Sequence, residues 1–343
     1  MINVALIGYG LAGRVFHAPL IAATEGLRLH TIVSRQHELI LQQHPQVRVL
    51  AQAANALADD AIDLIVIATP NALHAPLAMA ALERGRHVVV DKPFTVTLDE
   101  AERVAACAQR HRRVASVFQN RRWDGDYLTL RQLLQDGTLG ELAELHSHFD
   151  RFRPQVGERW RERDEPGGGL WFDLAPHLLD QALQLFGAPQ SLHADIAQQR
   201  QGARGADYFH AVLRYPRLRV MLHAGSLVAA SGLRFAAHGT RGSWIKHGLD
   251  VQESQLRSGL LPGQAGWGQE TAPAQWVDAE GSESPTRDLP VAPGDYRQYY
   301  AALRDAILHD TPPPVTVAQA LQLMRLLELG VQSSAEQRAL PCH

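Results

Sequence analysis

The chain has 343 residues, of which 45% are hydrophobic and 20% are charged, and its formal net charge is −3. This length and composition predict a globular protein of two or three domains, and the charge provides no basic field for nucleic acid. No apolar run reaches the ~20 residues that cross a bilayer, and no signal peptide is evident. The two cysteines indicate no disulfide framework. We therefore expect a soluble cytoplasmic protein without nucleic-acid or membrane partners.

The N-terminal part of the chain alternates strand-like and helix-like segments. Strands are predicted at Ile2–Ile7, Leu27–Val33, Ile62–Ala68, His87–Val90 and Val114–Phe118, with helices from the first glycines to about Thr24, at Pro76–Arg84 and at Leu98–His111. The run Ile62–Ala68 is almost continuously apolar, as expected for a strand covered on both faces. The alternation predicts an α/β fold, with a doubly wound parallel sheet of the Rossmann type over residues 1–118.

The pattern changes after Gln119. Helices are predicted at Leu128–Gln135, Leu174–Phe186, Asp295–Leu308 and Val317–Ser333, and strands at Leu142–Phe149, Leu192–Gln198, Tyr208–Tyr215, Arg219–Ala224, Leu233–His238 and Ser243–His247. Gly239–Gly242 is expected to turn a hairpin, and residues 250–290 to form surface loops. Residues 119–343 are therefore predicted to form a second, α+β domain for substrate binding and oligomerisation. Its open sheet is expected to be largely antiparallel, and its C-terminal helices to pack back on the first domain.

The most informative motif lies between the first strand and the first helix: Gly8-Tyr9-Gly10-Leu11-Ala12-Gly13. In this context the first glycine permits a tight turn, the second lets backbone approach a pyrophosphate, and the third lets helix and strand pack closely. The phosphates then face free N–H groups at the positive end of the helix dipole. The motif therefore predicts a dinucleotide-binding site.

The residues Val33-Ser34-Arg35, at the end of the second strand, bear on the choice of nicotinamide cofactor. An acidic residue here would accept hydrogen bonds from the adenosine ribose of NAD and would repel a 2′-phosphate. Ser34 can donate a hydrogen bond to that phosphate, and Arg35 can pair with it or stack on adenine. We therefore predict NADP(H) rather than NAD(H). The alternative is that Arg35 is a solvated loop residue.

Polar residues follow three further segments. Thr69-Pro70-Asn71, with His74, comes after the third predicted strand, and Asp91-Lys92-Pro93 comes after the fourth; Asp173 and His177 follow a triple glycine. Loops beyond the carboxyl ends of strands line the ligand crevice of a doubly wound sheet. The first two segments are therefore expected to meet the nicotinamide half of the cofactor, although His74 could instead cap the next helix.

Taken together, these motifs make the chain resemble the Gfo/Idh/MocA oxidoreductases (glucose–fructose oxidoreductase, inositol dehydrogenase, rhizopine catabolism) over nearly its whole length. The resemblance rests on the glycine motif, on Thr69-Pro70-Asn71-Ala72-Leu73-His74, on Asp91-Lys92-Pro93, and on Asp173 with His177. Most family members have Glu-Lys-Pro in place of Asp91-Lys92-Pro93, a difference of one methylene.

Two further stretches, Phe16-His17-Ala18-Pro19-Leu20 and Phe149-Asp150-Arg151-Phe152-Arg153-Pro154, look like the subgroup that contains bacterial NADP-dependent scyllo-inositol dehydrogenases. This resemblance implies an NADP-dependent dehydrogenase that transfers hydride between a cyclic polyol, with scyllo-inositol favoured, and its ketone. It also implies a homodimer or homotetramer. A dehydrogenase of a pyranose or other sugar, and a dinucleotide-binding sensor without hydride transfer, are the alternatives.

The family resemblance implies that Lys92, Asp173 and His177 are catalytic, and the chemistry of their side chains agrees. Oxidation of a secondary alcohol needs a group that takes the hydroxyl proton, and histidine titrates near neutrality. Asp173 could orient the imidazole or hold a hydroxyl, and Lys92 could stabilise an alkoxide and bind the nicotinamide ribose. The alternatives are an N-cap ahead of Pro176 for Asp173, a core histidine for His177 and a surface turn for Lys92.

Four residues of the second domain are candidates for substrate contacts. Asn120 and Arg121 follow the domain crossover, and Arg153 and Trp160 could offer a polyol hydrogen bonds and a flat apolar wall. Ordinary surface or interdomain contacts are the alternative for each residue. The 17 histidines show no spacing typical of metal ligands, so no metal site is expected.

Overall fold

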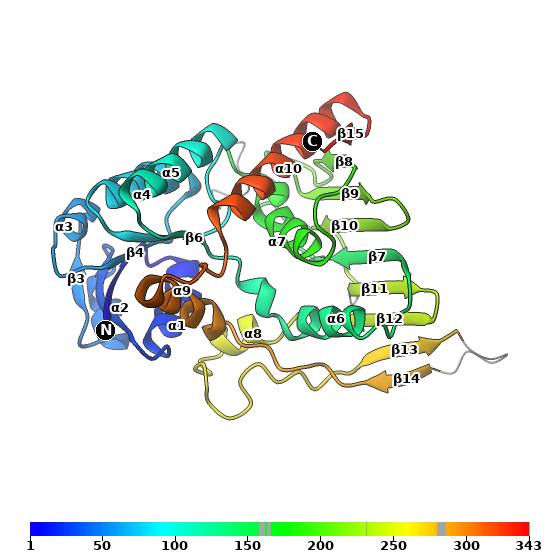
Figure 1. The fold of residues 1–343 in the computed structure, drawn as a ribbon, viewed down its shortest axis with the longest axis horizontal. Helices are drawn as coiled ribbons and strands as arrows, with labels where there is room; N and C mark the ends of the chain where they lie inside the picture. Colours follow the sequence, from blue (N-terminus) through cyan, green and yellow to red (C-terminus); the bar gives the residue numbers. More distant parts are fainter. Residues whose placement is uncertain (158–161, 163–165, 231, 280–285, 343) are drawn as a thin grey trace. The chain divides into compact units, whose positions relative to one another are not determined.

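The computed structural model describes residues 1–157, 162, 166–230, 232–279 and 286–342 (Figure 1). The chain divides into two units. Unit 1 comprises Met1–Trp123, Gln252–Trp267 and Asp295–Met324, and unit 2 comprises Asp124–Val251, Gly268–Gly294 and Arg325–His343. Unit 1 therefore includes two segments from the C-terminal part of the sequence.

Unit 1 contains a six-stranded parallel sheet in the order β3-β2-β1-β4-β5-β6. Its strands are β1 (Ile2–Ile7), β2 (Leu27–Val33), β3 (Arg48–Leu50), β4 (Leu64–Ile67), β5 (His87–Val90) and β6 (Ala115–Val117). Every residue of β4 is buried, in agreement with its uninterrupted apolar sequence. The chain order reverses between β1 and β4, and ligands of doubly wound sheets bind at such a point, beyond the carboxyl ends of the strands. The predicted parallel sheet is confirmed.

The helices of unit 1 are mostly short. They are η1 (Ala12–His17), α1 (Ala18–Ala22), α2 (His37–Gln43), α3 (Ala53–Leu57), η2 (Asn71–Leu73), α4 (His74–Glu83), α5 (Leu98–His111), η3 (Asn120–Trp123), α8 (Gln252–Arg257) and α9 (Arg297–His309). The predicted bounds of β1, β2, β5 and α5 agree residue for residue. The elements α2, β3 and α3, which were not predicted, have seven, three and five residues. Such lengths are too short to show a hydrophobic period.

Unit 2 contains a nine-stranded sheet in the order β14-β13-β12-β11-β7-β10-β9-β8-β15. Its strands are β7 (Leu142–His148), β8 (Ser191–Ala197), β9 (Tyr208–Arg214), β10 (Arg219–Gly225), β11 (Leu233–Gly239), β12 (Gly242–His247), β13 (Ala274–Asp278), β14 (Thr286–Leu289) and β15 (Leu340–Pro341). Neighbouring strands are antiparallel except β7 and β10, which are parallel. The predicted mostly antiparallel sheet and the β11–β12 hairpin are confirmed.

The expectation of surface loops over residues 250–290 is wrong in part. This segment contains α8 of unit 1 and the strands β13 and β14, which extend the sheet of unit 2 beside β12. Trp276 of β13 is buried opposite Trp244 of β12. The two strands have only five and four residues, so their alternation does not stand out from the polar sequence around them.

The helices of unit 2 include α6 (Gly125–Gln135) and α7 (Gly169–Phe186), and α10 (Val317–Glu336) contributes residues to both units. Helix α7 packs against β9 and β10. It begins five residues before the predicted start because the chain turns into the helix within the glycine run. Gly169 has a φ of +80°, and a Cβ there would lie 2.9 Å from the Ala206 nitrogen. Asp173 therefore lies inside the helix and does not cap it.

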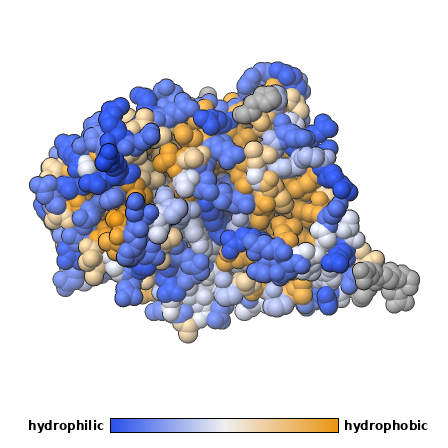
Figure 2. Space-filling model, in the orientation of Figure 1, coloured by the Kyte–Doolittle hydropathy of each residue, from blue (hydrophilic) through white to orange (hydrophobic). Residues whose placement is uncertain are grey.

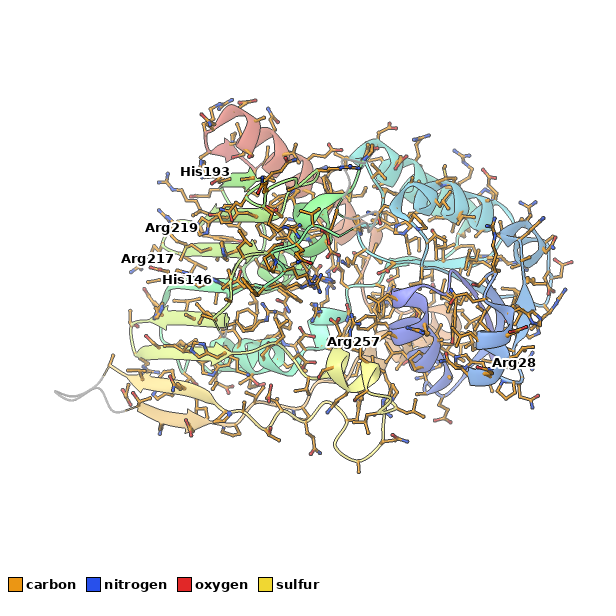
Figure 3. The ribbon with its side chains drawn as sticks, turned by 180° about the vertical axis from the view of Figure 1, so that it is seen from behind. Arg28, His146, His193, Arg217, Arg219 and Arg257 are labelled. Atoms are coloured by element: carbon orange, nitrogen blue, oxygen red, sulfur yellow. The ribbon has the colours of Figure 1, made fainter. Side chains whose placement is uncertain are left out.

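The two faces of the unit 2 sheet differ in burial. In β7, β9 and β10, buried residues alternate with residues that are only partly buried. His146 of β7 and Arg219 of β10, both labelled in Figure 3, belong to the second set, and the labelled His193 of β8 is exposed and pairs with Val212 of β9. One face of this sheet is thus core, and the other is accessible in part.

Hydrophilic side chains dominate the face of the molecule shown in Figure 2, with apolar residues gathered in patches between them. Aromatic residues are prominent among the largest fully buried side chains, as with Tyr299 and Tyr300 in unit 1 and Trp171 and Trp244 in unit 2. Within the described residues, no helix combines the length and the apolar character that crossing a membrane requires.

A buried arginine links the sheet of unit 2 to its helices. Arg234, in β11, is 1% exposed; its Nε donates to Asp126 Oδ2 at 3.2 Å, and its Nη2 donates to Gln181 Oε1 at 2.8 Å. Asp124 Oδ2 lies 4.0 Å from Nη2. One buried guanidinium therefore compensates charge on two buried carboxylates.

Arg234→Met should lower the free energy of unfolding by about 3–5 kcal/mol, because Asp124 and Asp126 would lose their buried counter-charge. Arg217→Met is the matched control: the side chains of the Arg217–Glu141 pair are 83% and 68% exposed, so its loss should cost less than about 1 kcal/mol. Chemical denaturation followed by circular dichroism measures both effects. Equal losses in the two variants would contradict this role of the buried network.

Candidate active site

The three glycines of the turn after β1 differ in their surroundings. Gly8 has a φ of +103°, and a Cβ there would lie 2.3 Å from the Ala68 carbonyl oxygen. A Cβ on Gly13 would lie 2.1 Å from the Gly8 carbonyl oxygen, whereas a Cβ on Gly10 would meet no protein atom within 4 Å. Packing of the protein therefore requires Gly8 and Gly13. Gly10 leaves open space, which fits the close approach of a pyrophosphate.

The side chain of Tyr9 belongs to the packing of unit 1. It is 2% exposed, and its hydroxyl donates to Gln43 Oε1 at 2.6 Å. The Tyr9 carbonyl accepts a hydrogen bond from Gln36 Nε2 at 3.0 Å, whereas Leu11 is 39% exposed. Tyr9 thus anchors the glycine turn to the end of α2, so its side chain serves the position of the turn.

The two residues predicted to select the cofactor follow β2 directly. The Ser34 N–H donates to the Leu50 carbonyl at 2.9 Å, and the Ser34 hydroxyl accepts a hydrogen bond from the Gln36 N–H at 3.2 Å. Arg35 is exposed, and its guanidinium pairs with none of the residues that the structure describes. The arrangement leaves the Arg35 charge accessible to a phosphate. The selection of NADP itself remains a prediction.

His74 joins the loops that follow β4 and β5. Its Nδ1 lies 2.9 Å from the Pro93 carbonyl oxygen, and its Nε2 lies 3.1 Å from the Thr69 carbonyl oxygen. Burial lowers the pKa of His74, against the opposing effects of the Asp91 carboxylate and of the hydrogen bonds to backbone carbonyls. The N-cap of α4 is Leu73, and no side chain caps this helix. His74 therefore holds two loops of the candidate cofactor site together.

Polar groups gather in these two loops. Asp91 is 7% exposed, its Oδ1 accepts a hydrogen bond from the Lys92 N–H at 2.8 Å, and the Lys92–Pro93 peptide bond is cis. Asn71 is buried at the start of η2. The buried Thr69 hydroxyl has no hydrogen-bond partner among the described residues. A buried hydroxyl that hydrogen-bonds to no described residue fits a loop that binds a polar ligand such as nicotinamide riboside.

Gln119 is a further candidate that the sequence motifs did not indicate. It lies just beyond β6, it is 1% exposed, and neither Nε2 nor Oε1 of its side chain hydrogen-bonds to a described residue. Its position after a parallel strand is the same signal that pointed to Thr69 and Asp91. The rule that polar residues after strands line the crevice could therefore have found it.

His17 is another buried polar residue of unit 1, singled out in the sequence only as part of a subgroup motif. Its Nδ1 lies 2.6 Å from the Tyr300 hydroxyl of α9, and its ring packs on Phe118 with centroids 4.3 Å apart. Burial lowers the pKa of His17 to about 4, although Asp91 opposes the shift. His17 is therefore a neutral histidine that ties η1 to α9.

Asp173 and His177 lie one turn apart on α7 and share one helical face. His177 is 5% exposed, and Asp173 Oδ2 lies 3.7 Å from Arg151 Nη1. The Arg151 guanidinium also lies over the Phe149 ring, 5.0 Å from its centroid. Helix α7 thus presents an imidazole and a carboxylate together. Arg151, which the sequence indicated only as part of the subgroup motif, pairs with this carboxylate.

The four predicted substrate residues have different surroundings. Asn120 and Arg121 begin η3 in unit 1 and are each 5% exposed, and Arg121 Nη2 pairs with Glu253 Oε2 at 2.9 Å. Arg153 is exposed. Trp160 lies outside the described residues. The ion pair fixes the Arg121 side chain in place, and the roles of all four residues in substrate binding remain predictions.

Each unit supplies one half of the predicted site. Unit 1 gathers the cofactor-side residues at the carboxyl ends of neighbouring parallel strands, and Lys92 belongs to this group. Unit 2 gathers Asp173 and His177 on one face of α7. The convergence of these three side chains beside the nicotinamide ring therefore remains a prediction.

Gly10→Ala and Gly13→Ala should separate cofactor binding from folding. A methyl group at Gly10 meets no protein atom, so the melting temperature should not change, but NADPH should bind about tenfold more weakly or worse because its pyrophosphate needs that space. Gly13→Ala should lower the melting temperature, because its methyl group would overlap the Gly8 carbonyl. Scanning fluorimetry and NADPH fluorescence titration measure the two effects. Unchanged NADPH affinity in a folded Gly10→Ala variant would contradict the predicted phosphate site.

Two family models match the chain. Residues 2–119 match the NAD-binding Rossmann fold of the Gfo/Idh/MocA oxidoreductase family, and residues 131–342 match the C-terminal alpha/beta domain of the same family. The first match contains the glycine turn and the loops after β4 and β5. The second contains α7 with Asp173 and His177.

Similar proteins cover the chain almost from end to end. The oxidoreductase YdgJ of Escherichia coli (strain K12) is 52% identical over 341 residues, which are 99% of this chain and 98% of YdgJ. The scyllo-inositol 2-dehydrogenase (NADP(+)) IolW of Bacillus subtilis (strain 168) is 35% identical over 341 residues, 99% of this chain and 95% of IolW. The crystal structure of an oxidoreductase from Klebsiella pneumoniae has a TM-score of 0.93 at 48% identity and covers 100% of this chain and 96% of its own. The chain belongs to the Gfo/Idh/MocA family of oxidoreductases and is an NAD(P)-binding dehydrogenase that acts on CH–OH groups.

Proposed function

We propose that the protein is an NADP-dependent dehydrogenase of cyclic polyols that interconverts scyllo-inositol and its 2-keto form. The observation that carries this proposal is the pairing, in one chain, of an open glycine turn after β1 with an imidazole and a carboxylate one turn apart on α7. Similarity to the scyllo-inositol 2-dehydrogenase IolW along nearly the whole chain supports the choice of substrate and of cofactor.

Residues of unit 1 would hold the cofactor. The turn at Gly10 has room for the pyrophosphate, and Ser34 and Arg35 would take the adenosine 2′-phosphate. The nicotinamide half would be held by the residues that follow β4 and β5, namely Thr69, Pro70, Asn71, Asp91 and Lys92. When bound, the nicotinamide ring accepts or supplies the hydride.

Three side chains would carry the chemistry on the substrate. His177 would take the hydroxyl proton during oxidation and return it during reduction, because imidazole exchanges protons near neutral pH. Asp173, one turn away, would orient the imidazole or hold a neighbouring hydroxyl. The Lys92 ammonium would stabilise the negative charge that develops on the substrate oxygen.

We propose further that the half-accessible face of the unit 2 sheet packs against a second copy of the chain. Partly buried apolar residues such as Val212 and Met221 lie on this face between polar ones, which suits an interface between subunits.

The two cysteines, Cys107 and Cys342, are both free thiols. Unpaired cysteines are typical of a reducing compartment, and we propose a cytoplasmic location.

A spectrophotometric screen tests the proposed reaction. The protein should reduce NADP+ with scyllo-inositol, and it should oxidise NADPH with 2-keto-myo-inositol. Glucose and other pyranoses should react poorly in the same assay. Turnover of pyranoses with no turnover of any inositol would replace the proposed substrate by a sugar. NADPH binding without consumption, in folded protein, would instead identify a dinucleotide sensor.

His177→Ala should lower kcat by about 10²–10⁴-fold and leave the dissociation constant of NADPH nearly unchanged, because the lost interaction belongs to proton transfer. His309→Ala, at the exposed end of α9, is the control and should retain full activity. Steady-state kinetics measures kcat, and fluorescence titration measures the dissociation constant of NADPH. If NADPH affinity collapses while turnover survives, His177 has a structural role and not the proposed one.

Arg35→Asp should reverse the preference for NADP over NAD, because a carboxylate repels the 2′-phosphate and accepts hydrogen bonds from the ribose. Arg28→Asp makes the same change of charge at an exposed position near the start of β2 and should leave the preference unchanged. Arg28 is labelled in Figure 3. The measurement is the ratio of kcat/KM for the two cofactors. The same ratio in Arg35→Asp as in the unmodified protein would remove Arg35 from cofactor selection.

A further inference from the structure

Strand register gathers ionisable side chains at one end of the unit 2 sheet. Across β8, β9, β10 and β7, Asp195 lies opposite His210, His210 opposite His223, and His223 beside His148. Asp150 comes two residues after His148, where the chain has left β7. Four neighbouring strands therefore contribute to a single polar row on the face opposite α7.

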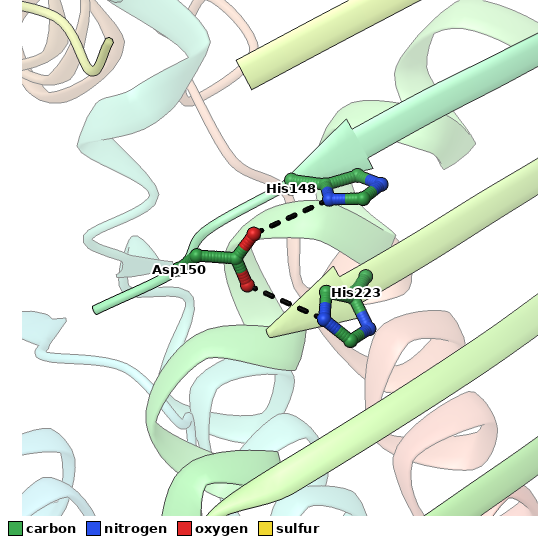
Figure 4. Close-up of side chains that lie close together, drawn as sticks. All are labelled: His148, Asp150 and His223. Carbon is green, nitrogen blue, oxygen red and sulfur yellow. Dashed lines mark hydrogen bonds and ion pairs between the residues drawn. The ribbon is translucent and has the colours of Figure 1, made fainter. Parts of the chain in front are cut away.

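The side chains of His148 and His223 in this row converge on Asp150 (Figure 4). Asp150 Oδ2 lies 3.3 Å from His148 Nδ1, and Asp150 Oδ1 lies 3.4 Å from His223 Nε2. Each residue offers one ligand atom, and these atoms lie within 4.8 Å of one another. The side chains of His148, Asp150 and His223 are 20%, 6% and 16% exposed. The cluster is thus a largely buried carboxylate between two imidazoles.

The spacing within the cluster allows a shared cation. Asp150 faces the two imidazoles with different oxygens, Oδ2 toward His148 at 3.3 Å, a hydrogen-bond distance, and Oδ1 toward His223 at 3.4 Å. Two ligands on a tetrahedral zinc ion, with bonds of about 2.0–2.2 Å, lie about 3.3–3.5 Å apart. Both carboxylate contacts have this length, and one ligand atom from each of the three residues lies within 4.8 Å of the other two.

Neighbouring backbone groups hold the cluster in place, as the outer partners of metal ligands do. Asp150 Oδ1 accepts a hydrogen bond from the Gly225 N–H at 3.0 Å. The Arg151 N–H donates to the Gly225 carbonyl at 2.9 Å, so the segment after β7 is fastened to β10. The carboxylate is thus oriented before any ligand binds.

We propose that His148, Asp150 and His223 bind a divalent transition-metal cation, with Zn²⁺ as the best match. Imidazole nitrogen suits Zn, Fe, Ni or Cu, whereas Mg²⁺ and Ca²⁺ prefer oxygen ligands alone. Three protein ligands leave one tetrahedral position for water. The ion would bind the end of β7 to β10 and fix the segment that carries Arg151 to Asp173. This site is separate from the residues proposed for the dehydrogenase reaction, and its test does not depend on that reaction.

Metal analysis of the unmodified protein is the first test. Full-length protein without a histidine tag is treated with chelator, mixed with one equivalent of Zn²⁺ and passed through gel filtration. Mass spectrometry of the elements should find one Zn²⁺ retained per chain, and no Mg²⁺ after the same treatment. Loss of all Zn²⁺ on the column would overturn the proposal.

Variants then locate the ion. His223→Ala and Asp150→Asn should each weaken Zn²⁺ binding by at least about 100-fold, since even the outer partners of metal ligands contribute 10–100-fold. His193→Ala, exposed on β8 and labelled in Figure 3, should bind Zn²⁺ like the unmodified protein. Equal Zn²⁺ affinity in all three variants would place the ion elsewhere and overturn the proposal.

X-ray absorption of the Zn²⁺-loaded, unmodified protein tests the identity of the ligands even if the variants do not fold. The spectrum should show two imidazole ligands and otherwise oxygen. Sulfur in the first coordination shell would point to Cys107 or Cys342 and would overturn the assignment.

Discussion

The contact between the Gly8 turn and β4 is the constraint on which the candidate site depends. The Ala68 carbonyl oxygen occupies the space where a Cβ of residue 8 would lie, and the Gly8 carbonyl does the same for Gly13. Glycine at these positions permits this contact beyond the parallel pair β1 and β4, whose carboxyl ends open at the same edge of the sheet. Residues as distant in sequence as Thr69 and Asp91 therefore lie at the same edge of the sheet as the glycine turn, in which Gly10 leaves space for a phosphate.

The two units use their histidines in different ways. In unit 1, burial lowers the pKa values of His17 and His74, and both rings make fixed contacts with backbone carbonyls or a tyrosine hydroxyl. They hold η1 and the loops after β4 and β5 in place, and this suits a domain that must present a rigid surface to a dinucleotide. In unit 2, α7 carries His177 and Asp173 together, and the proposed proton transfer falls to this helix.

How far the fold could be predicted depended on the length of each element. Helix α5 and the strands β1, β2 and β5 were predicted to the residue, because a strand buried on both faces and a capped amphipathic helix each leave a strong local pattern. The strands β13 and β14, with five and four residues, were missed, since their alternation is too brief to recognise. The start of α7 was misplaced because glycines normally interrupt helices, whereas here Gly169 turns the chain into one beside Ala206.

The sequence by itself determined the features that rest on local sterics: the glycine turn, the parallel sheet that follows from alternating strands and helices, and the spacing of Asp173 and His177 on one helical face. The tertiary structure alone decided which polar residues are buried and which lie together, as with Gln119, with Arg234 among its carboxylates, and with His148, Asp150 and His223. Strand order and register pair residues that are far apart along the chain, and no local pattern encodes that pairing. A histidine in β7 and another in β10 therefore become neighbours only when the two strands lie side by side.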